Sequence, residues 1–401
     1  MSRSFQAGKF TLFVLLFAGM PSILGTAAVA PVLGLMRDAF GAPEVVINLV
    51  LTLPPLATAL SGFFIGALSD KVGRVKILSG ALLFFGLAGV SGFFLEDLYA
   101  IIACRLVLGI SIAGILPMVS ALITEYYAPE IAARYLGYLS ASNGICVTVL
   151  QTACGALAIL GWHYSFLIYI LGLAALPFVI IFLKEPVRKS QEEKSSSADE
   201  KPMPKVGMYV LVYLTMILCA VMMYLPTVNL SYYLAEAGIS DSAFWTGLLL
   251  GVFGISSTIT GILFWRIASR LSFGRIFALV FGLETAGLIT IGISQNIFVI
   301  CAGLILIGFA LGLALPNASA WIGKITPGRV LGKFMSGVTV SIFVGLFCTT
   351  FAAPVLLGIV GAGNYAGMFL LCACAGLLLM VFWLIFGRKL AKKRGIGLEN
   401  Q

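Results

Sequence analysis

The chain has 401 residues, of which 60% are hydrophobic and only 10% are charged, and its formal net charge is +9 at pH 7. In water-soluble domains about a quarter of all residues are charged. The composition of this chain therefore excludes a water-soluble globular protein and indicates that lipid surrounds part of it. The positive charge alone could suggest nucleic acid, but its distribution along the chain, given below, excludes that partner.

Twelve apolar runs are long enough to cross a bilayer as helices, which takes about 20 residues. The first run is too long for a cleaved signal peptide, and further spans follow it. The sequence therefore predicts an all-α membrane protein with twelve transmembrane helices. In chain order the runs cover residues 10–35, 45–68, 77–95, 98–122, 136–159, 164–183, 207–234, 243–265, 275–294, 297–322, 334–358 and 365–386.

A charged segment with several serines and prolines, residues 184–206, follows the sixth span and predicts a flexible cytoplasmic linker. It divides the chain into an N-terminal six-helix bundle, residues 1–183, and a C-terminal six-helix bundle, residues 207–401. The two halves resemble each other, since residues 114–141 and 312–340 both have Leu-Pro inside a span, a proline in the next loop and a basic residue opening the next helix. Repeats of this kind are typical of transporters built from two pseudo-symmetric bundles around a site at the membrane midplane.

The basic residues show the orientation of the spans. With the N-terminus inside, all of the 25 lysines and arginines except Arg37 and Arg105 fall in cytoplasmic segments, as the positive-inside rule requires. We therefore expect an integral protein of a bacterial inner membrane with both termini in the cytoplasm, acting as a monomer.

The turn between the second and third spans reads "GALSDKVGRVK", residues 66–76, and has a degenerate partner in residues 261–275. Glycines supply the unusual backbone angles of a short turn, and the basic residues hold it in the cytoplasm. Topology needs no acid there, so we expect Asp70 to pair with Arg134 or with a helix N-terminus at the seam between the bundles. A pair that is made in one conformation and broken in another acts as a latch. The candidates for this latch are Gly66, Asp70, Lys71, Gly73, Arg74 and Arg134, with Glu125 and Glu130 as expected contacts of Lys71 or Arg74.

This turn resembles the signature loop of the major facilitator superfamily, Gly-x-Leu-Ala/Ser-Asp-Arg/Lys-x-Gly-Arg-Arg/Lys. The resemblance extends over the whole chain, through the twelve spans, the central linker and the repeated motif. It implies the major facilitator fold and transport by rocking of the bundles about a midplane site. The matching residues are Gly66, Leu68, Ser69, Asp70, Lys71, Gly73 and Arg74, with Lys76 one place beyond the last basic residue of the pattern.

Two further stretches resemble the drug:proton antiporter branch of that family. "RLVLGISIAG", residues 105–114, is similar to its Arg-x-x-x-Gly-x-x-x-x-Gly pattern, and "GWHYSF", residues 161–166, is similar to Gly-Trp-Arg-x-x-Phe with His163 in place of the arginine. Antiporters of this branch usually have a Gly-x-x-x-Gly-Pro-x-x-Gly-Gly run in the fifth span. Here that span has Gly144 and Gly155 but no Gly-Pro.

Two charged residues inside spans are candidates for coupling. Arg105 lies about seven residues into the fourth span, roughly 10 Å along the helix, where a charge costs at least ~2.5 kcal/mol without a partner. It is either a structural arginine or a cavity residue that tunes a proton site or binds an anion, and the first span offers no acid to pair with it. Glu284 is the only acid near the middle of a span. It is either a proton carrier or a protonated structural residue.

The resemblance also implies a cavity lined mainly by the first, fourth, seventh and tenth spans. Few of the residues there are polar, which suits a moderately hydrophobic small molecule. For each candidate residue, the alternative to ligand contact is a role in helix packing alone. The candidate cavity residues are Met20, Ser111, Tyr224, Asn229, Tyr232, Asn317 and Trp321, with Asn143 and Gln151 from the fifth span.

No sequence motif indicates catalysis. The chain has no phosphate-binding loop that would point to ATP, and no cluster of histidine, cysteine and acid at metal-ligand spacing. We therefore expect neither an enzyme nor a cofactor or metal. The favoured hypothesis is proton-coupled efflux of small amphipathic compounds or drugs, with protons and the lipid bilayer as further partners. The alternative, favoured by Arg105 and by the fifth span without Gly-Pro, is an uptake carrier or facilitator for an organic anion or metabolite.

Overall fold

The computed structural model describes residues 8–22, 25, 29–186, 206–240, 242–326 and 331–394. The side chains of some residues within these ranges, including Asp70, Glu130 and Asn143, are outside the description. All regular structure in the described ranges is helical, which confirms the predicted all-α fold. The helices form two compact units, Met1–Ser190 with Ser242–Leu248, and Gln191–Asp241 with Leu249–Gln401.

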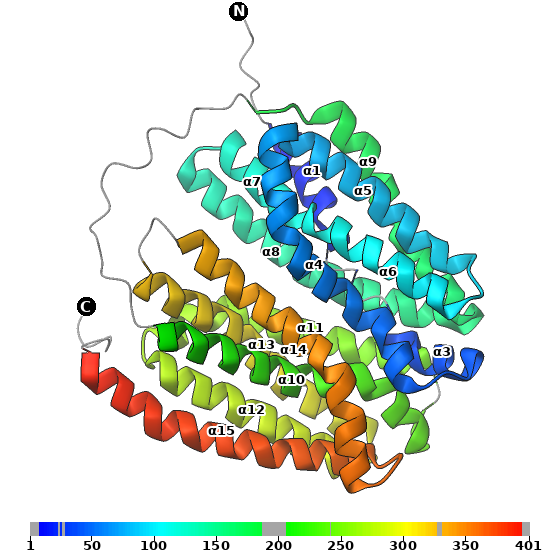
Figure 1. Ribbon diagram of the computed structural model, residues 1–401, viewed down its shortest axis with the longest axis vertical. Coiled ribbons are helices and arrows are strands. Elements are labelled where there is room, and N and C mark those ends of the chain that lie inside the picture. Colours follow the sequence, from blue (N-terminus) through cyan, green and yellow to red (C-terminus); the bar gives the residue numbers. More distant parts are fainter. Residues whose placement is uncertain are drawn as a thin grey trace, which may run out of the picture. The chain divides into compact units, whose positions relative to one another are not determined.

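In the first unit, α4 packs along α6, α5 packs along both α6 and α9, and α1 packs along α9 (Figure 1). Two pairs of segments each form one span: α6 with α7, and the short helix η4 with α9. The helices of this unit are α1 (Lys9–Gly19), η1 (Ala30–Val32), α3 (Leu33–Phe40), α4 (Glu44–Val72), α5 (Arg74–Val90), η2 (Ser91–Phe93), α6 (Leu98–Ala113), α7 (Leu116–Tyr126), α8 (Pro129–Leu157), η3 (Ala158–Leu160), η4 (Trp162–Tyr169) and α9 (Ile170–Phe182).

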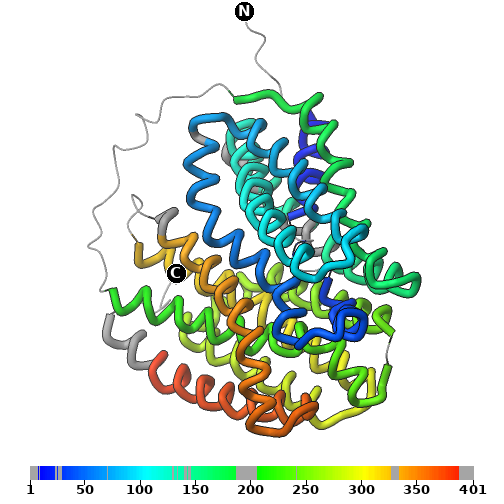
Figure 2. Tube along the Cα trace, turned by 45° about the vertical axis from the view of Figure 1, so that its right-hand side comes forward, coloured from blue at the N-terminus to red at the C-terminus, as the bar shows by residue number. Residues whose placement is uncertain are grey.

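In the second unit, α12 packs along both α13 and α15, and α10 packs along α14. Figure 2 shows the chain of this unit running back and forth through long helices, from green to red. The helices are α10 (Val206–Glu236), α11 (Ala243–Ala268), α12 (Phe273–Gly292), α13 (Ile297–Ile325), α14 (Leu331–Val360) and α15 (Tyr365–Arg394). The first residues of α11 group with the first unit.

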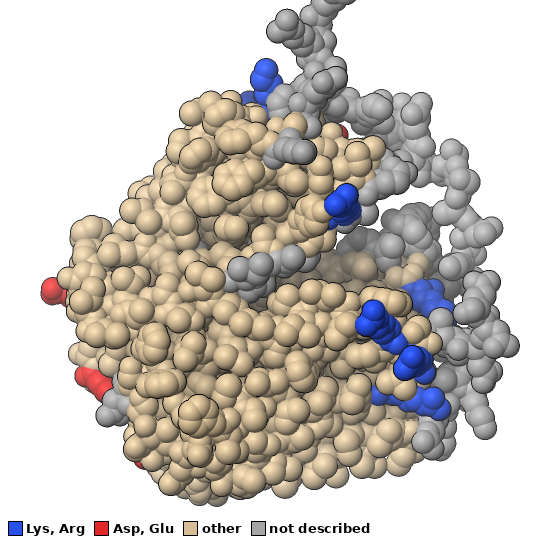
Figure 3. All heavy atoms as spheres, turned by 180° about the vertical axis from the view of Figure 1, so that it is seen from behind, with Lys and Arg blue, Asp and Glu red and all other residues tan. Residues whose placement is uncertain are grey.

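Ten helices in the described ranges are long and apolar enough to cross a membrane. Two shorter apolar stretches, Phe10–Gly19 and Cys146–Leu160, lie within the first and fifth predicted spans. Large apolar side chains on these helices face outward; Phe63 and Phe64 on α4 are 81% and 72% exposed. Figure 3 shows a broad surface with very few charged side chains. Such a surface is stable when lipid covers it.

Capping residues explain where the fourth and tenth spans begin. The carboxylate of Asp97 accepts hydrogen bonds from the backbone N–H groups of Tyr99 and Ala100, at 3.1 and 3.3 Å. In the second unit, the side chain of Asn296 accepts from the backbone N–H of Phe298 at 2.9 Å. Both residues satisfy backbone donors that the first helical turn leaves unpaired. The two halves therefore start equivalent spans in the same way.

Candidate functional site

The turn between α4 and α5 is built on Gly73. Its backbone has φ +109° and ψ 151°, a region that only glycine adopts readily. A Cβ on Gly73 would also lie 2.7 Å from the carboxyl carbon of Glu185. Gly66 stands inside α4, where the hydroxyl of Ser69 donates to its carbonyl at 2.7 Å. The turn thus joins two helices through a single residue that must be glycine.

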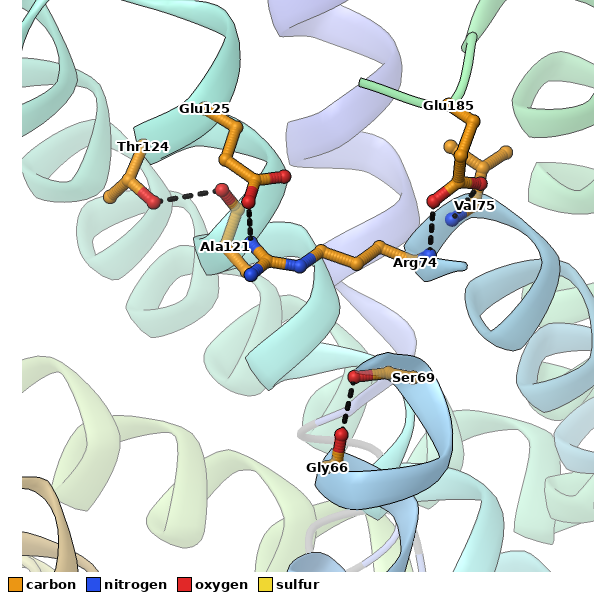
Figure 4. A network of polar contacts seen from close by, with 8 residues as sticks. All are labelled: Gly66, Ser69, Arg74, Val75, Ala121, Thr124, Glu125 and Glu185. Atoms are coloured by element: carbon orange, nitrogen blue, oxygen red, sulfur yellow. Dashed lines mark hydrogen bonds and ion pairs between the residues drawn. The ribbon is translucent and has the colours of Figure 1, made fainter. Parts of the chain in front are cut away.

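Arg74 of this turn forms an ion pair with Glu125 at the end of α7. The distance from Nη1 to Oε1 is 2.6 Å, and the two side chains are 26% and 34% exposed. Figure 4 shows the guanidinium reaching across from α5 to the carboxylate. Of the two partners expected for Glu125, Lys71 and Arg74, the structure places Arg74 against it.

Glu185, which follows α9, binds the N-terminus of α5. Its carboxylate accepts hydrogen bonds from the backbone N–H groups of Arg74 and of Val75, the latter at 3.0 Å. An acid at a helix N-terminus satisfies free donors and interacts favourably with the helix dipole. No sequence motif points to this residue. Its one signal is that an acid follows the sixth span at an end that the sequence predicts to be cytoplasmic, where topology favours basic residues.

Two neighbouring tyrosines at the end of α7 bind backbone carbonyls close to the first and the last described residues of the first unit. The hydroxyl of Tyr126 donates to the carbonyl of Lys184, and that of Tyr127 donates to the carbonyl of Gly8 at 3.1 Å. Burial, with a smaller contribution from the nearby Tyr135, raises the pKa of Tyr127 to about 12. Tyr127 therefore remains a hydrogen-bond donor at physiological pH.

The remaining latch candidates stay predictions. The side chain of Asp70 lies outside the described residues. Arg134 donates from Nε to the hydroxyl of Tyr138 at 2.6 Å, and its guanidinium lies 5.4 Å from the centroid of that ring. Lys71 is exposed. The Asp70–Arg134 pair stays a prediction.

Arg105 is the most deeply buried cation that the structure describes, at 1% exposure. Its guanidinium carbon lies 4.5 Å from the ring centroid of Phe166 and 4.7 Å from that of Tyr169. The hydroxyl of Tyr169 also hydrogen-bonds to this guanidinium. It faces the residues of η4, inside the first unit.

Glu284 is fully buried on α12 in the second unit. The thiol of Cys219 on α10 donates to its Oε1 at 2.9 Å, whereas its Oε2 has no partner among the described residues. The adjacent hydroxyl of Thr285 also lacks a partner there. A Cβ on Gly376 of α15 would lie 2.4 Å from the Thr285 hydroxyl. Because Cys219 belongs to α10, both α10 and α15 approach α12 near the Glu284 carboxyl group.

Four candidate cavity residues lie in the second unit with partners of their own. Asn229 donates to the carbonyl of Leu225 at 2.8 Å, and Tyr232 stacks on Tyr365 with centroids 6.3 Å apart. Asn317 and Trp321, one turn apart on α13, both contact Phe273 on α12. Asn317 donates to its carbonyl at 3.1 Å, and the Trp321 and Phe273 rings stack with centroids 5.6 Å apart. The structure thus brings Asn317 and Trp321 together in an aromatic cluster beside α12.

The other candidate cavity residues are less defined. Ser111 is buried and donates to the carbonyl of Val107 at 2.8 Å. Gln151 is buried, and its carbonyl Oε1 has no partner among the described residues. Met20 and Tyr224 are half-buried, and the side chain of Asn143 is outside the description. The lining of a cavity by these residues remains a prediction.

Comparison with protein families decides the class of the protein. The model of the Major Facilitator Superfamily matches residues 15–294 and again residues 212–400. The chain belongs to the Major Facilitator Superfamily. The superfamily expected from the signature turn is therefore confirmed, and it is a family of membrane transporters, not of enzymes.

Solved structures of superfamily members share this fold over nearly the whole chain. A bacterial homologue of the human lysosomal transporter Spinster, in an inward-facing and occupied conformation, has a TM-score of 0.76 at 16% identity, covering 96% of this chain and 97% of that one. A variant of the nucleoside transporter NupG has a TM-score of 0.77 at 12% identity, covering 93% and 98%. At these identities the likeness concerns the fold alone.

Relatives within the superfamily have different named substrates. The niacin transporter NiaP of Acinetobacter baylyi is 28% identical over 34% of this chain and 31% of its own length. The sialic acid transporter NanX of Escherichia coli is 24% identical over 64% and 63%. The quinolone resistance protein NorB of Staphylococcus aureus is 25% identical over 44% and 37%. The matches thus span between about a third and just under two thirds of these proteins.

Proposed function

We propose that this protein is a secondary transporter that exports small amphipathic organic compounds, drugs included, in exchange for protons. Alternating access of one midplane site to the two faces of the membrane would move the compound. The similarity to a quinolone resistance protein supports export, as does the arginine pattern of the fourth span. The apolar character of the candidate cavity residues supports an amphipathic substrate.

The observation that carries this proposal is the environment of Glu284. Its carboxyl group lies on a membrane-spanning helix and is fully buried. One oxygen accepts a hydrogen bond from the Cys219 thiol, and the other has no partner among the described residues. A carboxylate in such a place is costly unless it binds a proton, and ionisable residues within spans commonly form proton pathways. Loss and gain of this proton would tie the conformational cycle to the proton gradient.

The test is transport by the purified full-length protein in liposomes with an imposed pH gradient. We expect wild-type protein to move substrate against the proton flow, because each cycle carries one species in each direction. Glu284→Gln should make transport independent of the gradient while leaving exchange of labelled for unlabelled substrate. Glu236→Gln, at an exposed acid near the end of α10, is the matched control and should retain coupling. Wild-type transport that ignores the gradient would refute proton-driven export.

A second candidate, a carrier for an organic anion, is favoured by Arg105. Its buried charge has no acid beside it in the ion pairs of the described residues, and niacin and sialic acid, named for two relatives, are both carboxylic acids. A panel of cationic, neutral and anionic solutes in the same liposomes separates the two functions. Selective uptake of anions that Arg105→Ala abolishes would favour the carrier over the exporter.

A further inference from the structure

The second unit has two like charges at the positions where the first unit has an ion pair. Arg275 follows a glycine near the start of α12, just as Arg74 follows one at the start of α5. Lys324 follows the proline of the Leu-Pro pair in its span by eight residues, and so does Glu125. Alignment of the two halves therefore matches Arg275 and Lys324 to the two partners of the ion pair in the first unit, whose side chains are in contact at 2.6 Å. Neither of the two matched cations takes part in an ion pair among the described residues.

The ends of three other helices lie at the start of α12. The turn after α11 leads directly into α12, and Lys324 at the end of α13 has its Nζ 5.9 Å from the centroid of the Phe273 ring. A Cβ on Gly274 would lie 2.6 Å from the Cα of Gly387, so α15 touches α12 here through two glycines. From this contact α15 continues to Arg394. The charged residues of these four helix ends therefore gather at one end of the second unit.

All of the charged residues at these helix ends are basic. Of residues 242–401 only Glu284 and Glu399 are acidic. Glu284 is buried in the middle of α12, and Glu399 follows the end of α15 in the sequence. Positive charges that gather without an acid repel one another, and an anion from outside the chain offsets this repulsion. The basic end of the second unit consists of Arg266, Arg270, Arg275, Lys324, Arg388, Lys389, Lys392, Lys393 and Arg394.

Exposed apolar side chains beside the basic end place it at the level of lipid headgroups. Trp265 is 64% exposed, and its ring centroid lies 5.2 Å from the guanidinium carbon of Arg266. Phe386, the residue before the glycine contact of α15, is 48% exposed. Tryptophan is enriched where the hydrocarbon core meets the headgroups. Arg275 and Lys324, which are both exposed, therefore lie within reach of lipid phosphate groups.

We propose that Arg275 and Lys324, within this basic end, bind the phosphate group of one anionic membrane phospholipid. Phosphate oxygens accept charge-assisted hydrogen bonds from arginine and lysine, and clusters of basic residues directly beyond a membrane span attract anionic lipids. A phospholipid also supplies acyl chains to cover Trp265 and Phe386, which free phosphate does not. This inference does not rest on the proposed function, because it is independent of substrate and direction.

Thermal unfolding of the purified full-length protein in uncharged detergent, with phosphatidylglycerol or phosphatidylcholine added, tests the site. We expect phosphatidylglycerol to raise the midpoint by a few degrees more than phosphatidylcholine, and about 0.5 M sodium chloride to reduce this difference. The double variant Arg275→Gln with Lys324→Gln should lose most of the difference. Lys76→Gln with Lys184→Gln, at two exposed lysines of the first unit, makes the same change in charge and should respond as wild type does.

Lys324→Glu gives the second unit the charge pattern of the first and provides a second, independent variant. We expect a higher midpoint than wild type in phosphatidylcholine and little further gain from phosphatidylglycerol, because Arg275 then has an acid as its partner. Inorganic phosphate at the same ionic strength should leave the wild-type midpoint unchanged, and an equal shift with phosphate would overturn the lipid as the ligand. Equal stabilisation by the two lipids, or a wild-type response of the variants at Arg275 and Lys324, would overturn the site.

Discussion

At the scale of single residues, the ion pair between Arg74 and Glu125 contributes little to stability. Both side chains are about a third exposed or less, and exposed pairs contribute only about 0.2–1 kcal/mol to stability. The value of this pair lies in its position, because it joins the signature turn to the end of the fourth span.

Glu125→Gln should therefore lower the transport rate several-fold while leaving ligand affinity in detergent nearly unchanged, because the residue lies far from the membrane midplane. The loss in unfolding free energy should stay below about 1 kcal/mol. The charge-swapped double variant Arg74→Glu with Glu125→Arg should recover much of the rate. Equal loss of affinity and rate would contradict a conformational role, and Glu96→Gln, an exposed acid outside this pair, serves as the control.

At the scale of elements, the junction of α4 and α5 depends on the backbone of Gly73 and on the carboxylate that binds the start of α5. Gly66 belongs to the same signature but lies inside α4, where its surroundings differ: a Cβ there would meet nothing within 4 Å. The two glycines of one motif are thus expected to respond oppositely to the same substitution.

Gly73→Ala should destabilise the protein by about 1–3 kcal/mol, because alanine is strained at this φ and its Cβ would displace Glu185. Gly66→Ala should be neutral or stabilising by up to about 1 kcal/mol, because alanine favours the helix. Thermal unfolding of both variants in detergent measures the difference. Similar midpoints for the two variants would show that the turn is not held as described.

The sequence allowed the apolar spans to be predicted, and it narrowed the partner of Glu125 to Lys71 or Arg74, because hydropathy and opposite charges are properties of side chains. It did not reveal the role of Glu185, whose partners are backbone N–H groups about a hundred residues away along the chain. It also gave no sign that Phe166 and Tyr169 cover Arg105, because that contact depends on how closely η4 approaches α5. Contacts that depend on helix packing require the structure.

At the scale of the whole molecule, the distribution of basic residues predicts both termini in the cytoplasm. A green fluorescent protein fused after Gln401 should fluoresce, and alkaline phosphatase fused there should be inactive, because its disulfides form only outside the cytoplasm. The same phosphatase inserted after Gly361, between α14 and α15, should be active. An active phosphatase at the C-terminus would reverse the predicted orientation.

The contacts around the turn between α4 and α5 also bear on how this protein can diverge. Tyr126, Tyr127 and Glu185 all bind backbone atoms, which every residue type supplies. The residues at positions 184 and 8, whose carbonyls accept two of these bonds, can therefore be exchanged during evolution without loss of the contact. Arg74 and Glu125, by contrast, bind each other through side chains at both ends. Among diverging homologues, correlated substitution should thus appear at this pair, while the backbone-directed contacts persist without leaving any covariation.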